Sequence, residues 1–278
     1  MKKEEARKQF ANLLAGDEAN FELDRASLLI AAEEYPALNI EDYIAQFDRL
    51  ASTAQSRFAT NDDLGVRLLK LRDFLFSEIG FSGNQEDYFD ARNSFLSDVL
   101  DRRTGIPITL SVVFIEVARR VELPLVGVGM PGHFVVKCDA IERLILLDPF
   151  HGGRELTEDD CREMISKMYG QTLSFHPAFL RAVTKRQILT RMLQNLKGIY
   201  SRARDHHRLL GAVERSLLLN PGDATEVRDR GLAWMGIGKY GRALGDLEEY
   251  LTRVPAAGDR SEIRKRVGEL RQRQAGFN

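Results

Sequence analysis

Two polar residues in the middle of this 278-residue chain, His133 and Asp148, have the types and the spacing that acid–base chemistry requires. They stand at the outer ends of two short apolar segments, 133–138 and 143–148, whose Val, Leu and Ile content predicts β-strands. If the segments pair as a hairpin that sets His133 opposite Asp148, the two Cβ atoms lie about 5 Å apart on one face. A carboxylate in that position orients an imidazole and stabilises its protonated form, as in general-base catalysis. A structural hydrogen bond at the end of the sheet is the alternative interpretation.

Acyl-transfer chemistry would also need a nucleophile. The segment 108–118 is apolar at nearly every position, which predicts a buried helix. A cysteine at the start of such a helix would have a lowered pKa, but this helix begins without one. The hydroxyls of Thr109 and Ser111 are the candidate nucleophiles there. Hydroxyls in a buried helix usually bond to a backbone carbonyl. We expect neither Cys138, on the hairpin, nor Cys161, after an acidic run, to be catalytic.

The same region permits other kinds of site. His133, Asp148 and His151 could form a metal site of two histidines and one carboxylate. Nothing in the sequence requires such a site, and we expect no metal and no cofactor. Asn93 and Arg103 precede the buried helix and are candidate binding residues that could line the same cleft.

The remaining elements must position these residues. Apolar residues at helical spacing predict amphipathic helices in the first 80 residues. A loop rich in turn formers follows, then a short helix that leads into the buried one. The expected helices are 23–35, 40–58, 64–80, 94–102 and 156–170, and a further strand is expected within 123–130.

The last third of the chain has an internal repeat. Pro221 and Pro255 lie 34 residues apart, which is the period of a tetratricopeptide repeat. Alignment on these prolines places Tyr200 on Trp234, and the segment 261–274 would form a capping helix. About two repeats cannot form a long solenoid, so we expect the rest of the protein to cover one end of them.

Charge also divides the chain. Residues 1–180 carry 20 Lys and Arg against 30 Asp and Glu, whereas residues 181–278 carry 20 against 11. We therefore predict one domain over 1–180, made of the N-terminal helices and the core around the buried helix, and a repeat domain over 181–278. Two domains suit the chain length. The basic run 181–208 fits docking on the acidic region better than nucleic acid, because only Tyr200 within it could stack on a base.

Composition points to an ordinary globular protein. The start, MKKEEARKQF, lacks the apolar core of a signal peptide, and no apolar run reaches the roughly 18 residues that a bilayer requires. Two cysteines do not form a disulfide framework. We therefore expect a cytoplasmic protein without a membrane partner.

Four segments together, RNSFL, RRTGIPITL, PGHF and LDPFHGG, resemble the bacterial SirB-type proteins. That resemblance implies a core related to transglutaminases and papain-like cysteine proteases, followed by tetratricopeptide repeats. It also implies that His133 and Asp148 match the His and Asp of the catalytic triad in active relatives. The Cys of that triad would fall near Pro107–Thr109, where this chain has none.

The resulting prediction is an α+β protein that is mostly helical. It has N-terminal helices, a transglutaminase-like core with a small antiparallel sheet around a buried helix, and C-terminal repeats. The favoured function is a non-enzymatic or vestigial transglutaminase-like module that binds a protein or peptide through its repeats. The alternative is a hydrolase or acyltransferase that uses His133 and Asp148 with a hydroxyl or water nucleophile.

Overall fold

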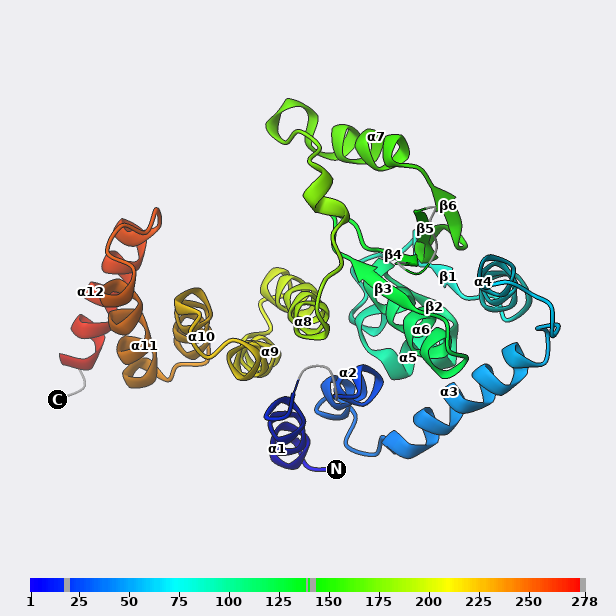
Figure 1. The fold of residues 1–278 in the computed structure, drawn as a ribbon. Helices are drawn as coiled ribbons and strands as arrows, with labels where there is room; N and C mark the ends of the chain where they lie inside the picture. The colour runs from blue at the N-terminus through cyan, green and yellow to red at the C-terminus, as the bar shows by residue number, and fades with distance from the viewer. Residues whose placement is uncertain (18–20, 139, 141–143, 276–278) are drawn as a thin grey trace. The chain divides into compact units, whose positions relative to one another are not determined.

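The computed structural model describes residues 1–17, 21–138, 140 and 144–275, drawn in Figure 1. Contacts divide the chain into two compact units, Met1–Met192 and Leu193–Asn278. The predicted division at residue 180 comes earlier in the chain than this one, which falls inside helix α8 (Lys185–Arg202). The predicted class, a mostly helical α+β protein, is confirmed.

Two of the N-terminal helices in the first unit have starts that are set by side-chain caps. The Asn39 side chain accepts from the backbone N–H of Glu41 at the start of α3, and Asp63 accepts from Val66 at the start of α4. Such caps satisfy backbone donors that lack a partner within the helix. The predicted helix 64–80 ends in a π-helical turn, η1. The bounds are α1 Lys3–Leu14, α2 Leu23–Ala32, α3 Ile40–Gln55, α4 Leu64–Asp73 and η1 Phe74–Glu78.

Helix α6 (Pro107–Arg120) is the buried helix that the sequence predicts. Eleven of its 14 residues are buried. Proline suits its first position, where the missing N–H would have no partner within the helix. The preceding segment comprises β1 (Ser82–Gly83), η2 (Ala91–Ser94), α5 (Leu96–Arg102) and β2 (Thr104–Gly105). Strands β1 and β2 pair in parallel, a contact that the sequence did not predict.

The C-terminal end of α6 is tied to the preceding helices by Arg120. Its guanidinium lies 2.6 Å from the carboxylate of Asp24, 2.8 Å from Asp48 and 3.0 Å from Glu116. Burial, together with the negative charge of Asp24, raises the pKa of Glu116 to about 7. This ion-pair cluster joins α2, α3 and α6.

The sheet has four antiparallel strands in the order β3 (Leu125–Val128), β4 (Val135–Cys138), β5 (Ile145–Asp148) and β6 (Arg154–Leu156). The predicted strand pair 133–138 and 143–148 is confirmed as β4 and β5, but the predicted register is wrong. Val136 pairs with Leu147, so that the register differs by two residues from one that sets His133 opposite Asp148. The predicted turn, 139–142, lies largely outside the described residues, as does Arg143.

The register difference is an even number of residues. Because side chains alternate between the two faces of a strand, a shift of two residues keeps each side chain on its predicted face. His133 precedes β4 and Asp148 ends β5, so the two are diagonal neighbours instead of directly opposed ones. Diagonal neighbours remain within reach of long side chains.

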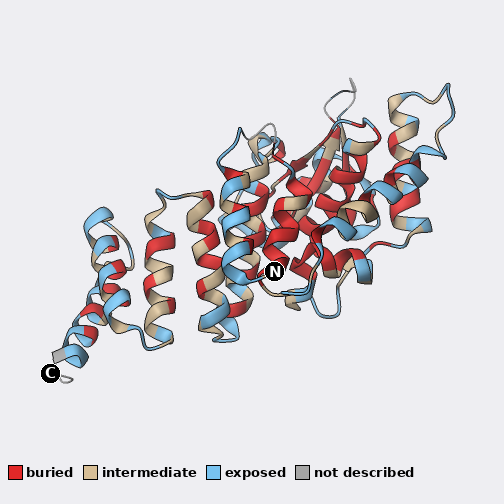
Figure 2. Cartoon of the chain, turned by 90° about the horizontal axis from the view of Figure 1, so that it is seen from below, coloured by how far each residue is buried: buried red, intermediate tan, exposed pale blue. Residues whose placement is uncertain are grey.

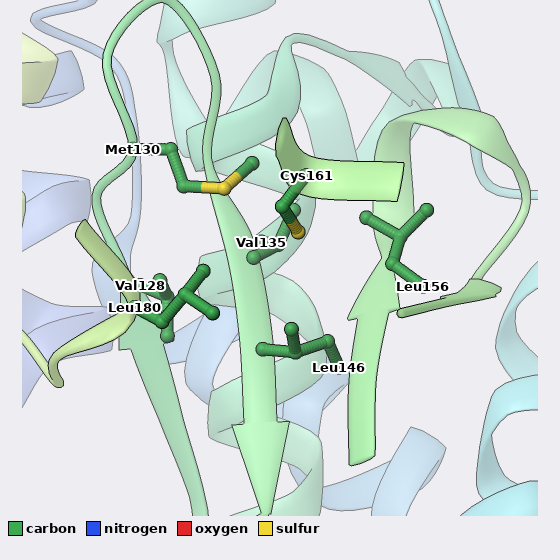
Figure 3. Packing of buried hydrophobic residues seen from close by; sticks show 7 residues of the cluster. All are labelled: Val128, Met130, Val135, Leu146, Leu156, Cys161 and Leu180. Atoms are coloured by element: carbon green, nitrogen blue, oxygen red, sulfur yellow. The ribbon is translucent and has the colours of Figure 1, made fainter. Parts of the chain in front are cut away.

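Both faces of the sheet are covered, as the absence of a clean polar alternation predicts. Helix α7 (Glu158–Tyr169) covers one face, and α6 contacts strands β3 and β4. Figure 3 shows the cluster under α7, with the Cys161 side chain close to those of the strands. This cluster is made of Val128, Met130, Val135, Leu146, Leu156, Cys161 and Leu180.

The second unit consists of paired helices, as the 34-residue period predicts. Helix α9 (His206–Leu219) follows α8 and contacts α10 (Ala224–Gly236), and α10 pairs with α11 (Tyr240–Arg253). Helix α12 (Arg260–Ala275), which contacts α11, is the predicted capping helix. Figure 2 shows that these helices carry buried residues along one side and intermediate or exposed residues elsewhere. That pattern is typical of a repeat whose units bury their apolar sides against their neighbours. None of the helices in the described part of the chain is long and apolar enough to cross a membrane.

The cluster under α7 can be tested with a matched pair of substitutions on one strand region. Leu146 is fully buried in the cluster, whereas Leu144 is 46% exposed. We expect Leu146→Ala to lower the free energy of unfolding by about 2–4 kcal/mol, because it leaves a cavity. Leu144→Ala should change it by less than about 0.5 kcal/mol. Urea denaturation measures both values, and equal effects would contradict this packing.

Candidate active site

The centre of the site is the carboxylate of Asp148, which two histidines share. His133 Nε2 lies 2.9 Å from Asp148 Oδ2, and His151 Nδ1 lies 2.7 Å from the same oxygen. The Asp148 residue is 1% exposed and His133 is 7% exposed, whereas the His151 side chain is 47% exposed. The predicted contact between His133 and Asp148 is therefore present, in a register other than the predicted one.

The backbone after β5 holds the carboxylate in place. Asp148 Oδ1 accepts from the backbone N–H groups of Phe150, at 3.1 Å, and His151, at 3.4 Å. These bonds start the short 3₁₀ helix η3 (Pro149–His151). The N–H of Gly153 then bonds to the carbonyl of Asp148 at 2.8 Å, with a φ of +74° at Gly153 that favours glycine. This turn brings the His151 ring back onto the carboxylate.

Electrostatics favour the charged form of the carboxylate. Burial by itself would raise the pKa of Asp148. The hydrogen bonds and charges of His133 and His151 outweigh burial, and the pKa of Asp148 lies below its ordinary value. An ionised Asp148 is the form that accepts an N–H from each imidazole.

The loop before β4 is held by a residue from far along the chain. Arg191 of α8 donates to the carbonyl oxygens of Met130 and His133, each at 2.7 Å. Met168 and Tyr169, at the end of α7, lie against Gly132 of this loop. No sequence pattern indicates this role for Arg191, which belongs to the basic run that we expected to dock on the acidic region of the chain.

Aromatic residues surround the histidines. The Phe150 ring is 6.3 Å from the ring of His133 and 5.1 Å from that of His151, in edge-on contacts. Phe150 also packs so closely on Gly83 that a Cβ at this position would lie 2.5 Å from the ring. Tyr88 contacts Phe150 at 6.0 Å and Phe89 at 5.4 Å, both edge-on. Four of the large apolar side chains that are exposed, Tyr88, Phe89, Met168 and Tyr169, thus lie near the site.

The hydroxyl candidates on α6 are fully buried. Thr109 Oγ1 donates to the carbonyl of Asn93 at 2.8 Å and accepts from the N–H of Ile106 at 3.1 Å. Ser111 Oγ donates to the carbonyl of Pro107 at 2.7 Å. Both hydroxyl protons are therefore used within the backbone network at the start of the helix.

Asn93 and Arg103 organise the segment that precedes α6. The buried Asn93 amide donates to the carbonyls of Asp87 and Tyr88, so that it shapes the loop bearing the exposed aromatic residues. Arg103 has a φ of +57°, ends α5 and donates to the carbonyl of Ile79 at 3.1 Å. The Asn93 side chain thus acts on the loop through hydrogen bonds to its backbone.

Comparisons with known proteins agree with this architecture. The sequence pattern of the transglutaminase-like superfamily matches residues 41–194, and a tetratricopeptide repeat pattern matches residues 196–268. A UPF0162 protein of Xylella fastidiosa is 34% identical over 93% of each chain, and one of Pseudomonas aeruginosa is 30% identical over 89% of this chain and 90% of its own.

The chain belongs to the UPF0162 family of transglutaminase-like proteins. The family resemblance predicted from the sequence is confirmed, both in the core and in the repeats. The mouse F-box only protein 21 is 35% identical over 136 residues, which are 46% of this chain and 21% of that protein. No solved structure matches the chain.

Neither cysteine of this transglutaminase-like unit lies at the start of α6. Cys138 is buried at the end of β4, and Cys161 is buried in the cluster under α7. Burial, with nearby carboxylates that include Asp148, raises the pKa of the Cys161 thiol to about 11. A thiol with so high a pKa is almost entirely protonated near neutral pH and is a poor nucleophile.

The repeat unit contains a separate concavity. A groove of about 850 Å³ is lined mainly by α8 and α10, with contributions from α9 and one residue of α12. Lys197 of α8, Leu232 and Met235 of α10, and Arg266 of α12 contribute to its walls. Lys197 lies 2.7 Å from Glu226 and 2.8 Å from Asp229, so its charge is paired within the unit.

The shared carboxylate predicts a pH-dependent stability. Because the pKa of Asp148 is lower in the folded than in the unfolded protein, its stabilisation is complete above the unfolded-state value of about 3.9 and is lost as the pH falls through the folded-state value. We expect Asp148→Asn to cost about 1–3 kcal/mol at pH 7. The cost relative to the wild type should shrink as the pH falls below about 4.

Urea denaturation at a series of pH values measures this difference. Asp159→Asn is the matched control, since that side chain is 93% exposed on α7. It should change the stability by less than about 0.5 kcal/mol at every pH. A cost of Asp148→Asn that is the same at pH 7 and pH 3 would contradict the lowered pKa.

Proposed function

We propose that the chain is a protein-binding module whose repeat unit takes an extended or helical segment of a partner protein in the groove lined mainly by α8, α9 and α10. The groove carries this proposal, because its volume of about 850 Å³ and its mixed apolar and charged walls suit a peptide. The transglutaminase-like unit then serves without covalent catalysis by a side chain. Its Thr109 and Ser111 hydroxyls are bonded to backbone groups, and the thiol of Cys161 is deactivated by burial.

Two glycines allow the groove to be filled without disturbing the fold. Gly198 lines the groove on α8, and Gly245 lies on α11, which does not contribute to the groove walls. A Cβ at either position meets no atom within 4 Å. Replacement of a mid-helix glycine also favours the helix by up to about 1 kcal/mol. Gly198→Glu and Gly245→Glu are therefore matched variants.

We expect Gly198→Glu to weaken partner binding at least about tenfold, which is roughly 1.4 kcal/mol, because the new side chain occupies the groove. Gly245→Glu should leave the affinity unchanged. Peptides selected from a displayed library on the full-length chain, with affinities measured by fluorescence anisotropy, provide the test. Equal affinities for the two variants, or a library that yields no binder, would argue against the proposal.

A second candidate function is hydrolysis by an activated water molecule, which the 2.9 Å contact between His133 and Asp148 favours. Since Nε2 of His133 is bonded to Asp148, Nδ1 is the ring nitrogen that can take a proton from water. Asp148 would stabilise the imidazolium that forms. The exposed aromatic residues near the site, such as Tyr88 and Tyr169, would contact the substrate.

This second candidate predicts a specific pattern of losses in a panel of ester and peptide-amide substrates. His133→Gln should lower kcat/KM at least about 100-fold, which is typical for loss of a general base. Ser111→Ala should retain the activity, because water and not this hydroxyl is the nucleophile. Melting temperatures report whether each variant is folded. Wild-type protein without His133-dependent turnover would remove this candidate and leave the binding function untouched.

A further inference from the structure

We infer that His133, Asp148 and His151 form a binding site for a divalent transition-metal ion of the zinc class. One ligand atom can be chosen from each residue so that all three lie within 4.8 Å of one another. His133 Nε2 and His151 Nδ1 approach Asp148 Oδ2 to 2.9 and 2.7 Å. This inference goes beyond the proposed binding function, which concerns the repeat unit.

The chemistry of the donor atoms selects the class of ion. Two imidazole nitrogens with one carboxylate suit Zn²⁺, Co²⁺, Ni²⁺ or Fe²⁺, whereas Mg²⁺ and Ca²⁺ prefer sites made of oxygen alone. Zinc binds His nitrogen and Asp oxygen at about 2.0–2.2 Å, so the ligand atoms around it lie on the order of 3 Å apart. The present separations are close to that spacing.

The local backbone supports the ligands from outside. Asp148 uses Oδ1 for the N–H groups of Phe150 and His151, which leaves Oδ2 to the histidines. Arg191 fixes the carbonyl of His133 and so limits movement of that residue. Such outer contacts orient metal ligands and are typical of metal sites.

His151 distinguishes this cluster from a simple pair of His133 and Asp148. A pair for proton transfer needs only one imidazole on the carboxylate. The second imidazole is half exposed, so burial of an apolar surface does not explain its position. Its exposure also leaves that side of the cluster open to solvent, from which an ion would enter and where a water ligand could complete the coordination.

Metal binding and proton transfer compete for the same atoms. To bind the ion, each imidazole must be neutral and must carry its proton on the other ring nitrogen, so that a lone pair replaces the N–H that now points at Oδ2. The ion then bridges the three groups in place of the two hydrogen bonds. A metal-bound His133 cannot donate Nε2–H to Asp148.

The test is titration of the full-length, chelator-treated chain with ZnCl₂ by isothermal calorimetry, and with CoCl₂ by visible absorption. We expect one ion per chain and a cobalt spectrum typical of a site with nitrogen ligands. His151→Ala, which removes a half-exposed ring and should leave the fold intact, is expected to weaken zinc binding at least 100-fold. His207→Ala, on the exposed surface of α9, should have no effect.

Asp148→Asn provides a second variant, with circular dichroism to show that it is folded, and should also weaken zinc binding at least tenfold. Three results would overturn the inference. The first is that zinc does not bind with 1:1 stoichiometry. The second is that wild type and His151→Ala bind zinc with the same affinity. The third is that magnesium binds as tightly as zinc. The calorimetric readout is independent of any enzymatic activity.

Discussion

The structure of the transglutaminase-like unit depends on one buried negative charge. Asp148 is almost fully enclosed, and an unpaired carboxylate there would be costly. Its two oxygens are divided between two tasks. Oδ1 accepts backbone N–H groups that start η3, and Oδ2 accepts from His133 and His151. The charge is therefore compensated by groups from the loop before β4 and from the turn after β5.

The elements around this carboxylate make its burial feasible. Helix α7 covers the sheet on one face, α6 contacts strands β3 and β4, and η3 contacts α6. Arg191 is distant in sequence from the hairpin, yet it holds the carbonyl of His133. The site therefore depends on α8, whose later residues line the groove of the repeat unit. A truncation that removes α8 would disturb both features.

Sequence patterns predicted most of the fold because those patterns reflect burial. The apolar segment 108–118 became α6, and the 34-residue period became the helix pairs of the repeat unit. The short strand β6 and the β1–β2 pair were missed, since segments of two or three residues have no detectable period. The π-helical turn at 74–78 was also missed, because its sequence continues the apolar pattern of α4.

The contact between His133 and Asp148 was predicted correctly, but the register of the strands that carry them was not. The alternation of side chains is a property of the strands, whereas the register is set by a turn whose geometry the residue types did not reveal. Because the register error is two residues, both side chains still lie on the same face of the sheet. They are long enough to reach each other as diagonal neighbours. The hydrogen bonds that Arg191 donates could not be predicted from the residue types, because their acceptors are backbone carbonyl oxygens, which every residue carries.

The contact between Gly83 and Phe150 has a consequence for how related sequences vary. A side chain at position 83 would occupy the space of the Phe150 ring, which itself lies against both histidines. A Cβ at position 83 would also lie 2.5 Å from the backbone carbonyl oxygen of Phe150, so a smaller residue at position 150 would not make room for it. A family member that had lost the glycine would therefore have to move η3, and the histidine cluster with it.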